Sequence, residues 1–107
     1  MSIVKISELA DAPAEGMGKG FCLEHPFTCI KYDLALFKIK EKYYVIADRC
    51  HLCNSGLAQG QLNGLVVACM KGDHLWNIKT GVCKFNRVNS LPTYSVSVET
   101  DGLYINI

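Results

Sequence analysis

Two short stretches rich in cysteine and histidine constrain the fold of this chain more than any other feature. The first stretch contains Cys50, His51 and Cys53, and the second contains Cys69 and His74. Each is followed by strand-like sequence, so each is expected to form a loop beside a strand. Thiolate sulfur and imidazole nitrogen are the donors of zinc and iron–sulfur sites. The sequence therefore predicts a fold that brings the two loops together, with the chemistry of the protein located there.

The composition fits a single globular domain, residues 1–107, large enough to bury a core. Half of the residues are hydrophobic, 20% are charged, and the formal net charge is +1. This balance indicates neither a disordered chain nor a phosphate-binding surface, so nucleic acid is not an expected partner. The first residues lack the pattern of a signal peptide, and no apolar run approaches the length of a membrane span. We therefore expect a cytoplasmic protein with no membrane partner.

Strand patterns recur along most of the chain and are separated by turn residues. Residues 7–20, rich in alanine, glycine and proline, are expected to form a connecting loop with one helical turn near its start. Aromatic and β-branched residues favour strands on either side of Lys40-Glu41-Lys42, which is expected to form a turn. The expected strands are residues 3–6, 27–32, 34–39, 43–47, 66–68, 76–78, 94–98 and 103–107. Short strands at close spacing predict an all-β barrel or sandwich.

The remaining cysteines are Cys22, Cys29 and Cys83. In a reducing compartment cysteines are not expected to form disulfides. Free cysteine is among the most frequently buried residue types, so these three are expected to act as small hydrophobic residues of the core.

The residues that frame the two stretches resemble those of the Rieske iron–sulfur domain. Leu57 and Gly60 follow the first stretch, and Trp76 and Gly81 follow the second. The resemblance covers nearly the whole chain and is greatest to the small ferredoxins that serve aromatic-ring oxygenases. It implies an all-β, Rieske-type antiparallel sandwich or barrel with a small two-loop metal-binding subdomain at residues 48–78. It also implies a [2Fe-2S] cluster, electron transfer, and redox partners such as a reductase and an oxygenase.

In the Rieske pattern each loop supplies one cysteine and one histidine to the cluster. Cys50 and Cys69 stand 19 residues apart, as the two cysteines of the pattern do. The two histidine positions fall on Leu52 and Gly72, which have no side-chain donor for iron. The chain therefore departs from the pattern at half of its ligand positions.

Three ligand sets remain open. In the first, His51 and His74 join Cys50 and Cys69 around a [2Fe-2S] cluster with irregular ligands. In the second, Cys50 and Cys53 form a Cys-x-x-Cys loop that binds a single zinc or iron ion together with Cys69 and His74. In the third, no metal is bound, as in the small subunit of NADH-dependent nitrite reductases. The sulfurs of Cys50, Cys53 and Cys69 are expected to converge on one point whether or not metal is present, and His74 is a ligand in both sets with metal.

The sequence favours an electron-transfer component over a stand-alone enzyme. No nucleophile and base pair, phosphate-binding loop or acid pair is recognisable. The alternative is a non-redox subunit or interaction module that uses the same loops as a structural clip or contact surface. Leu52, Met70 and Leu75 lie near the loop tips, where they would form a docking face for a partner or cover the site from water.

Overall fold

The structure is a computed structural model that describes residues 3–50, 52, 54–72, 74–84 and 90–107. These residues form an all-β protein, as predicted, with the 3-10 turn η1 (Leu9–Asp11) between its first two strands. The strands are β1 (Ile3–Ser7), β2 (Gly18–Glu24), β3 (Lys31–Ile39), β4 (Lys42–Ala47), β5 (Leu62–Asn63), β6 (Val66–Ala68), β7 (Leu75–Asn77), β8 (Thr93–Tyr94), β9 (Val96–Glu99) and β10 (Gly102–Asn106). In the described part of the chain, no helix has the length and apolar character required to cross a membrane.

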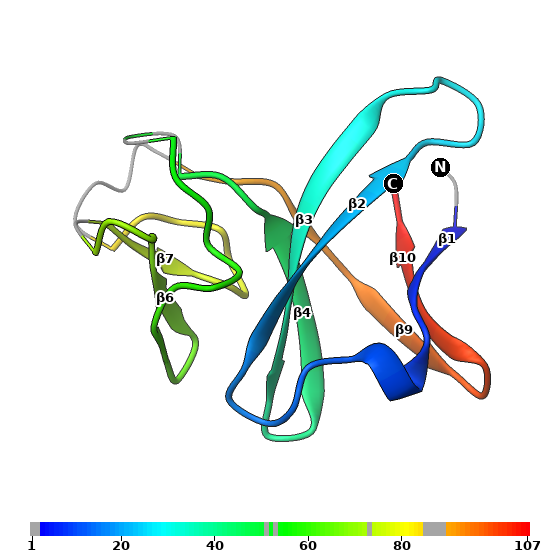
Figure 1. Ribbon diagram of the computed structural model, residues 1–107, viewed down its shortest axis with the longest axis horizontal. Coiled ribbons are helices and arrows are strands. Elements are labelled where there is room, and N and C mark those ends of the chain that lie inside the picture. The colour runs from blue at the N-terminus through cyan, green and yellow to red at the C-terminus, as the bar shows by residue number, and fades with distance from the viewer. Residues whose placement is uncertain (1–2, 51, 53, 73, 85–89) are drawn as a thin grey trace.

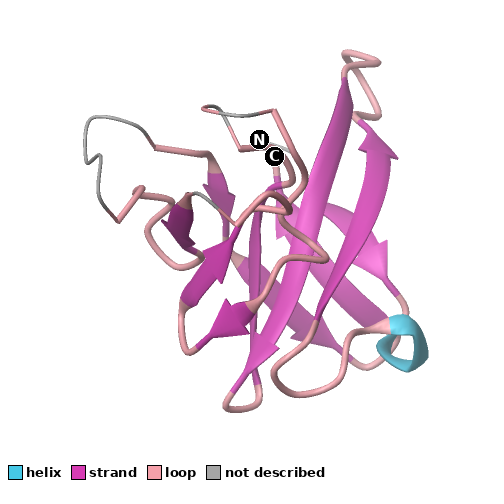
Figure 2. Cartoon of the chain, turned by 60° about the vertical axis from the view of Figure 1, so that its left-hand side comes forward, coloured by secondary structure: helices cyan, strands magenta, loops and turns pink. Residues whose placement is uncertain are grey.

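The strands pair antiparallel in three sheets, ordered β1-β10-β9, β2-β3-β4-β8 and β5-β6-β7. Figure 1 shows the β5-β6-β7 sheet and its loops set apart on one side of the molecule, while the other two sheets form the larger body. The view in Figure 2 shows the long β2–β3 hairpin extending beyond the rest of that body. The sequence between β4 and β7 thus forms a small structure of its own beside a larger β base.

The central strands β3 and β4 are buried on both faces. Side chains alternate between the two faces of a strand, so Leu34 and Leu36 point to one side and Ala35 and Phe37 to the other. All four are 0–1% exposed. This explains why β3 shows a continuous apolar run where a half-exposed strand would alternate.

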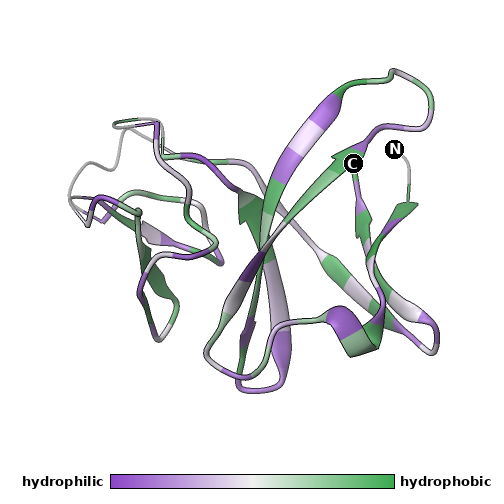
Figure 3. Ribbon diagram, viewed as in Figure 1, coloured by the Kyte–Doolittle hydropathy of each residue, from purple (hydrophilic) through white to green (hydrophobic). Residues whose placement is uncertain are grey.

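Two hydrophobic cores therefore flank the central sheet. The hairpin-side core, which includes the β9–β10 hairpin, consists of Ile6, Leu34, Leu36, Val45, Leu103 and Ile105. The loop-side core, which includes the two cysteine loops, consists of Ala35, Phe37, Ile46, Cys50, Leu57, Ala58, Val67, Cys69, Trp76, Ile78, Cys83 and Leu91. Figure 3 shows hydrophobic colouring on β6 and on the end of β4 that leads into the first loop.

The β3–β4 hairpin turns at Lys40 and Glu41, as predicted, but without glycine. Both residues have positive φ, 50° and 65°, as a type I′ turn requires. The Glu15 carboxylate accepts the backbone N–H groups of both residues, at 2.6 and 3.0 Å. These two bonds, first the one from Glu41, hold the pKa of Glu15 below its ordinary value of 4.5. The carboxylate thus stabilises a turn that the residues themselves disfavour.

Most predicted strands are confirmed, but the prediction for the region between η1 and β3 is wrong. The sequence predicts residues 18–20 in the connecting loop, yet β2 begins at Gly18 and pairs along its length with β3. It predicts a strand over residues 27–32, yet most of them make the β2–β3 connection, where Phe27 is 81% exposed. Here the His25 N–H donates to the carbonyl of Ile30 and closes the turn. Pairing with β3, and not local apolar pattern, decides where these strands lie.

The prediction for the three remaining cysteines is wrong for two of them. Cys83 is buried in the loop-side core, as expected. Cys22 is exposed on the edge strand β2, and Cys29 is exposed in the β2–β3 connection with a positive φ of 60°. Burial follows the place of a residue in the sheet, and a strand at the edge of a sheet exposes one of its faces.

Candidate metal centre

Each of the two cysteine loops is closed by a backbone hydrogen bond of the same kind. The N–H of Cys50 donates to the carbonyl of Ser55 at 2.8 Å, and the N–H of Cys69 donates to the carbonyl of His74 at 2.9 Å. In each case the partner lies five residues further along the chain. A cysteine therefore begins each loop, and the loop returns beside it.

A second bond tightens each loop from within. The carbonyl of Cys50 accepts the N–H of Asn54, and the carbonyl of Cys69 accepts the N–H of Gly72, both at 2.7 Å. Asn54 and Gly72 have positive φ, 62° and 78°, a conformation that asparagine and glycine adopt more readily than other residues. Gly72, at a position where the Rieske pattern has histidine, is therefore a turn residue in this chain.

Backbone contacts hold the two loops to each other and to the rest of the domain. The N–H of Met70 in the second loop donates to the carbonyl of Gly56 after the first, at 3.0 Å. One carboxylate oxygen of Asp48 accepts the N–H groups of Leu57 and Ala58, at 2.6 and 2.8 Å. At Gly60, a Cβ atom would lie 1.8 Å from the carbonyl oxygen of Ala68, so only glycine fits there. These contacts fix the separation of the loops.

Three side-chain donors meet between the loops. The Nδ1 atom of His74 lies 3.5 Å from Cys50 Sγ and 3.9 Å from Cys69 Sγ. The three donor atoms all lie within 4.8 Å of one another. Cys50 and Cys69 are 0% and 2% exposed, and His74 is partly buried. This arrangement suits a soft or borderline metal ion, because it offers two sulfurs and one imidazole nitrogen at the edge of an apolar core.

The predicted ligands are only partly covered by the structure. It brings together Cys50, Cys69 and His74, whose role as ligands stays a prediction. Cys53 and His51 lie outside the described residues, so the expected convergence of the Cys53 sulfur and the contribution of His51 stay predictions as well.

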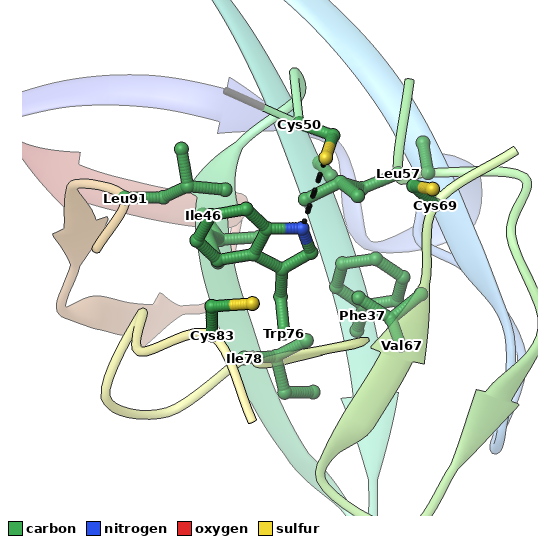
Figure 4. Packing of buried hydrophobic residues seen from close by; sticks show 12 residues of the cluster. Phe37, Ile46, Cys50, Leu57, Val67, Cys69, Trp76, Ile78, Cys83 and Leu91 are labelled. Atoms are coloured by element: carbon green, nitrogen blue, oxygen red, sulfur yellow. Dashed lines mark hydrogen bonds between the residues drawn. The ribbon is translucent and has the colours of Figure 1, made fainter. Parts of the chain in front are cut away.

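Trp76 adds a contact that sequence reasoning did not anticipate. Its indole N–H donates to Cys50 Sγ at 3.3 Å (Figure 4). The ring is 0% exposed and is packed in the loop-side core, with Cys83 on one side and Phe37 on the other (Figure 4). Phenylalanine usually stands at this position of the Rieske pattern. The tryptophan adds an N–H donor that phenylalanine lacks, and this difference in sequence could have predicted the hydrogen bond.

The loop tips expose apolar surface. Leu52 and Met70 are 40% and 55% exposed, whereas Leu75 is partly buried. Leu52 and Met70 thus face solvent, as a docking surface would, whereas Leu75 is less accessible to a partner.

Comparison with known proteins places the fold. No protein-family model and no curated protein matches the sequence. The ferredoxin of carbazole 1,9a-dioxygenase from Nocardioides aromaticivorans IC177 is similar, with a TM-score of 0.79 at 16% identity, over 98% of this chain and 97% of that chain. A chain from the complex of reduced oxygenase and oxidized ferredoxin in carbazole 1,9a-dioxygenase gives 0.76 at 20% identity, over 96% and 91%. A protein assigned as the small subunit of NADPH nitrite reductase gives 0.78 at 21% identity, over 100% of both chains.

The fold is therefore of the Rieske type seen in these small ferredoxins, and the predicted fold class is confirmed. A nitrite reductase small subunit shares it, so an electron carrier and a subunit of a larger enzyme are both compatible with the architecture. At these identities the likeness establishes the fold, and the ligands must be judged on the residues of this chain.

Those residues match one half of a Rieske ligand set. A Rieske cluster has two thiolates on one iron and two imidazoles on the other. Cys50 and Cys69 stand where the pattern has its two cysteines. Leu52 and Gly72 occupy the histidine positions, and His74 lies against both sulfurs instead of opposite them. The described residues therefore do not supply the imidazole half of a Rieske cluster.

Proposed function

We propose that this chain is a small electron-transfer protein with an iron centre held by Cys50, Cys69 and His74. It would carry single electrons between a reductase and an oxygenase or a related acceptor in the cytoplasm. The observation that carries the proposal is the meeting of these three donors at the loop end of a fold shared with oxygenase ferredoxins. Residues 48–78 would act as the metal-binding part of a single domain, residues 1–107.

The side chains around the donors suit a one-electron centre. Iron bound there would take up and release one electron, and the two thiolates would favour its oxidised state. The indole N–H of Trp76 opposes this preference, because a hydrogen bond to Cys50 Sγ withdraws negative charge from the sulfur and stabilises the reduced state. Burial of both sulfurs keeps water away from the metal–thiolate bonds.

A route for the electron is provided at the loop tips. His74 is partly buried, so its ring lies between the sulfurs and the surface. Leu52 and Met70 expose apolar side chains on the same two loops. Exposed apolar side chains of this kind suit a transient partner, because they form a contact without fixed ion pairs. Support for an oxygenase as partner comes from the similar chain in the carbazole 1,9a-dioxygenase complex of oxygenase and ferredoxin.

The cytoplasmic location is supported by the state of the cysteines. Among the described residues, Cys22, Cys29 and Cys83 are free thiols. Thiols persist where the compartment is reducing.

The [2Fe-2S] cluster that the sequence suggests needs more donors than these three side chains. Its second iron would have to be held by residues outside the group, for which the sequence offers Cys53 and His51. The second candidate function, a non-redox subunit with zinc or no metal, is favoured by the loss of both Rieske histidine positions to Leu52 and Gly72. It is also favoured by the likeness to the nitrite reductase small subunit.

The test is a redox titration of the whole chain. The protein is purified without oxygen, loaded with iron and titrated with a chemical reductant while its visible and EPR spectra are recorded. We expect one reversible one-electron step, retained in a Cys83→Ala control and absent from Cys50→Ala. A protein that binds iron but shows no reversible step between the potentials of flavin reductases and oxygenases is not an electron carrier, and the subunit function would then be preferred.

A further inference from the structure

The distances between the three donors limit the kind of metal centre they can form. Donors about 2.3 Å (sulfur) and 2.1 Å (nitrogen) from one tetrahedral metal lie about 3.6 Å apart. The observed separations of His74 Nδ1 from the two sulfurs are 3.5 and 3.9 Å. Both values are close to the tetrahedral distance, so a single ion can contact His74 Nδ1 together with either sulfur.

A cluster of two irons would require a different geometry. The two irons are bridged by sulfide, and their outer ligands point away from each other, so donors on different irons lie about 5 Å or more apart. In this chain every pair among the three donors is within 4.8 Å. His74 therefore cannot serve one iron while Cys50 and Cys69 serve the other unless the second loop changes shape.

The loop itself opposes such a change. The carbonyl of His74 accepts the N–H of Cys69, and Gly72 turns the loop through a positive φ between them. Moving the backbone of His74 outward to reach a second iron would break the Cys69–His74 bond that closes the loop. The other histidine position of the Rieske pattern, Leu52, has no donor to offer.

We propose that the centre is mononuclear: one tetrahedral metal ion held by Cys50 Sγ, Cys69 Sγ and His74 Nδ1. Cys53, which the sequence predicts as a further ligand, lies outside the described residues. Two thiolates and one imidazole suit Fe²⁺ and Zn²⁺. For its iron form, this inference rests on the proposed electron-transfer function. It replaces the two-iron cluster of the Rieske pattern with a single metal ion.

The first test uses cobalt, which reports its own coordination. The metal-free whole chain is titrated with Co²⁺ without oxygen. We expect saturation at one Co²⁺ per chain, with the intense visible bands of tetrahedral cobalt and a sulfur-to-metal charge-transfer band. The Cys83→Ala control should behave identically, and His74→Ala should lose the tetrahedral spectrum or bind at least about 100-fold more weakly, since it removes a direct ligand. A weak octahedral spectrum, or an unchanged one in His74→Ala, overturns the proposal.

The second test does not depend on a variant that folds. X-ray absorption of the iron- or zinc-loaded protein should show sulfur and nitrogen neighbours at about 2.3 and 2.1 Å and no second metal. The iron form, prepared with both Fe²⁺ and sulfide supplied in excess, should contain one iron and no acid-labile sulfide. Two irons with two sulfides per chain would overturn the mononuclear centre while leaving electron transfer intact. A tetrahedral cobalt site together with redox-inactive iron would remove the proposed function and leave the mononuclear centre standing.

Discussion

The two cores on either side of the central sheet differ in their residue types and in the length of the strands that enclose them. The hairpin-side core is entirely aliphatic in its buried residues and is enclosed by strands of four to nine residues. The loop-side core contains Trp76, Phe37 and three cysteines, and the strands that cover it, β5, β6 and β7, have only two or three residues each. The same sheet thus supports a self-sufficient core and a core completed by loops.

This difference suggests that the hairpin-side core mainly stabilises the fold and that the loop-side core supports the metal centre. Long paired strands satisfy their backbone groups through the sheet, whereas the loops depend on individual bonds such as that between Met70 and Gly56. Regions with few regular hydrogen bonds open at lower free energy than the rest of a protein. A metal ion bound between the loops would therefore stabilise the loop-side core most, because binding free energy adds to the stability of the state that binds.

The largest effect is expected from removing a sulfur from the metal centre. Cys50→Ala and Cys83→Ala delete the same thiol from the same core, but only Cys50 belongs to the donor group. We expect Cys50→Ala to weaken metal affinity by at least about 100-fold, more than the loss of an outer hydrogen-bond partner of a ligand. Cys83→Ala should bind metal as the native chain does. Equal affinities, measured by competition with a chelator, would remove the distinction between the two cysteines.

The second prediction tests whether the two faces of β3 act separately. Leu36 and Phe37 are neighbours in sequence, both 0% exposed, but they belong to opposite cores. Leu36→Ala should lower the free energy of unfolding by about 2–5 kcal/mol and Phe37→Ala by about 3–5 kcal/mol. Of these two variants, only Phe37→Ala should also weaken metal binding, because it removes a whole ring from beside Trp76 (Figure 4), a much larger loss than the single sulfur atom that Cys83→Ala removes there. Denaturant unfolding and metal titration of both variants check this. Weaker binding in Leu36→Ala would mean that the cores are coupled through the sheet.

A smaller effect is expected where the loop-side core touches the centre. Trp76→Phe removes the N–H that donates to Cys50 Sγ and keeps an aromatic ring in place. In the iron-loaded protein its reduction potential should fall, because the thiolate regains negative charge. Ile78→Val is the matched control, because it removes one methyl group from the same core without removing a hydrogen bond to the sulfur. It should lower the free energy of unfolding by about 0.5–1.5 kcal/mol and leave the reduction potential unchanged. A common shift in both variants would assign the effect to packing alone.

The smallest effect is expected at the β3–β4 turn, at the other end of β4 from Cys50. The pKa of Glu15 is lowered in the folded chain, so the folded state binds fewer protons there than the unfolded state. Its stabilising contribution is present above its ordinary value of 4.5 and is lost as the pH falls through the lower, folded-state pKa. Glu15→Gln should therefore flatten the acid dependence of stability in denaturant unfolding, with metal affinity unchanged at neutral pH. Native-like acid dependence in the variant would mean that the carboxylate does not support the turn.

The sequence itself determined the parts of this protein that depend on local pattern. The continuous apolar run of β3, the turn at Lys40 and Glu41 and the alternation of the C-terminal hairpin predicted their strands, since side-chain alternation and turn chemistry act over a few residues. Cys50, Cys69, Leu57 and the glycines that frame them predicted the Rieske-type fold.

Other features were decided by the tertiary structure. Gly18–Glu24 forms a strand only because β3 offers it a partner, and Cys22 is exposed because that partner leaves β2 at an edge. His74 is 24 residues from Cys50 in sequence, and two five-residue loop closures bring their donors within 3.5 Å. Trp76 reaches the Cys50 sulfur by the same long-range packing. Spacing along the chain identifies the donor residues. The distances between their donor atoms depend on how separate strands pair, and these distances decide whether the donors suit one metal ion or two.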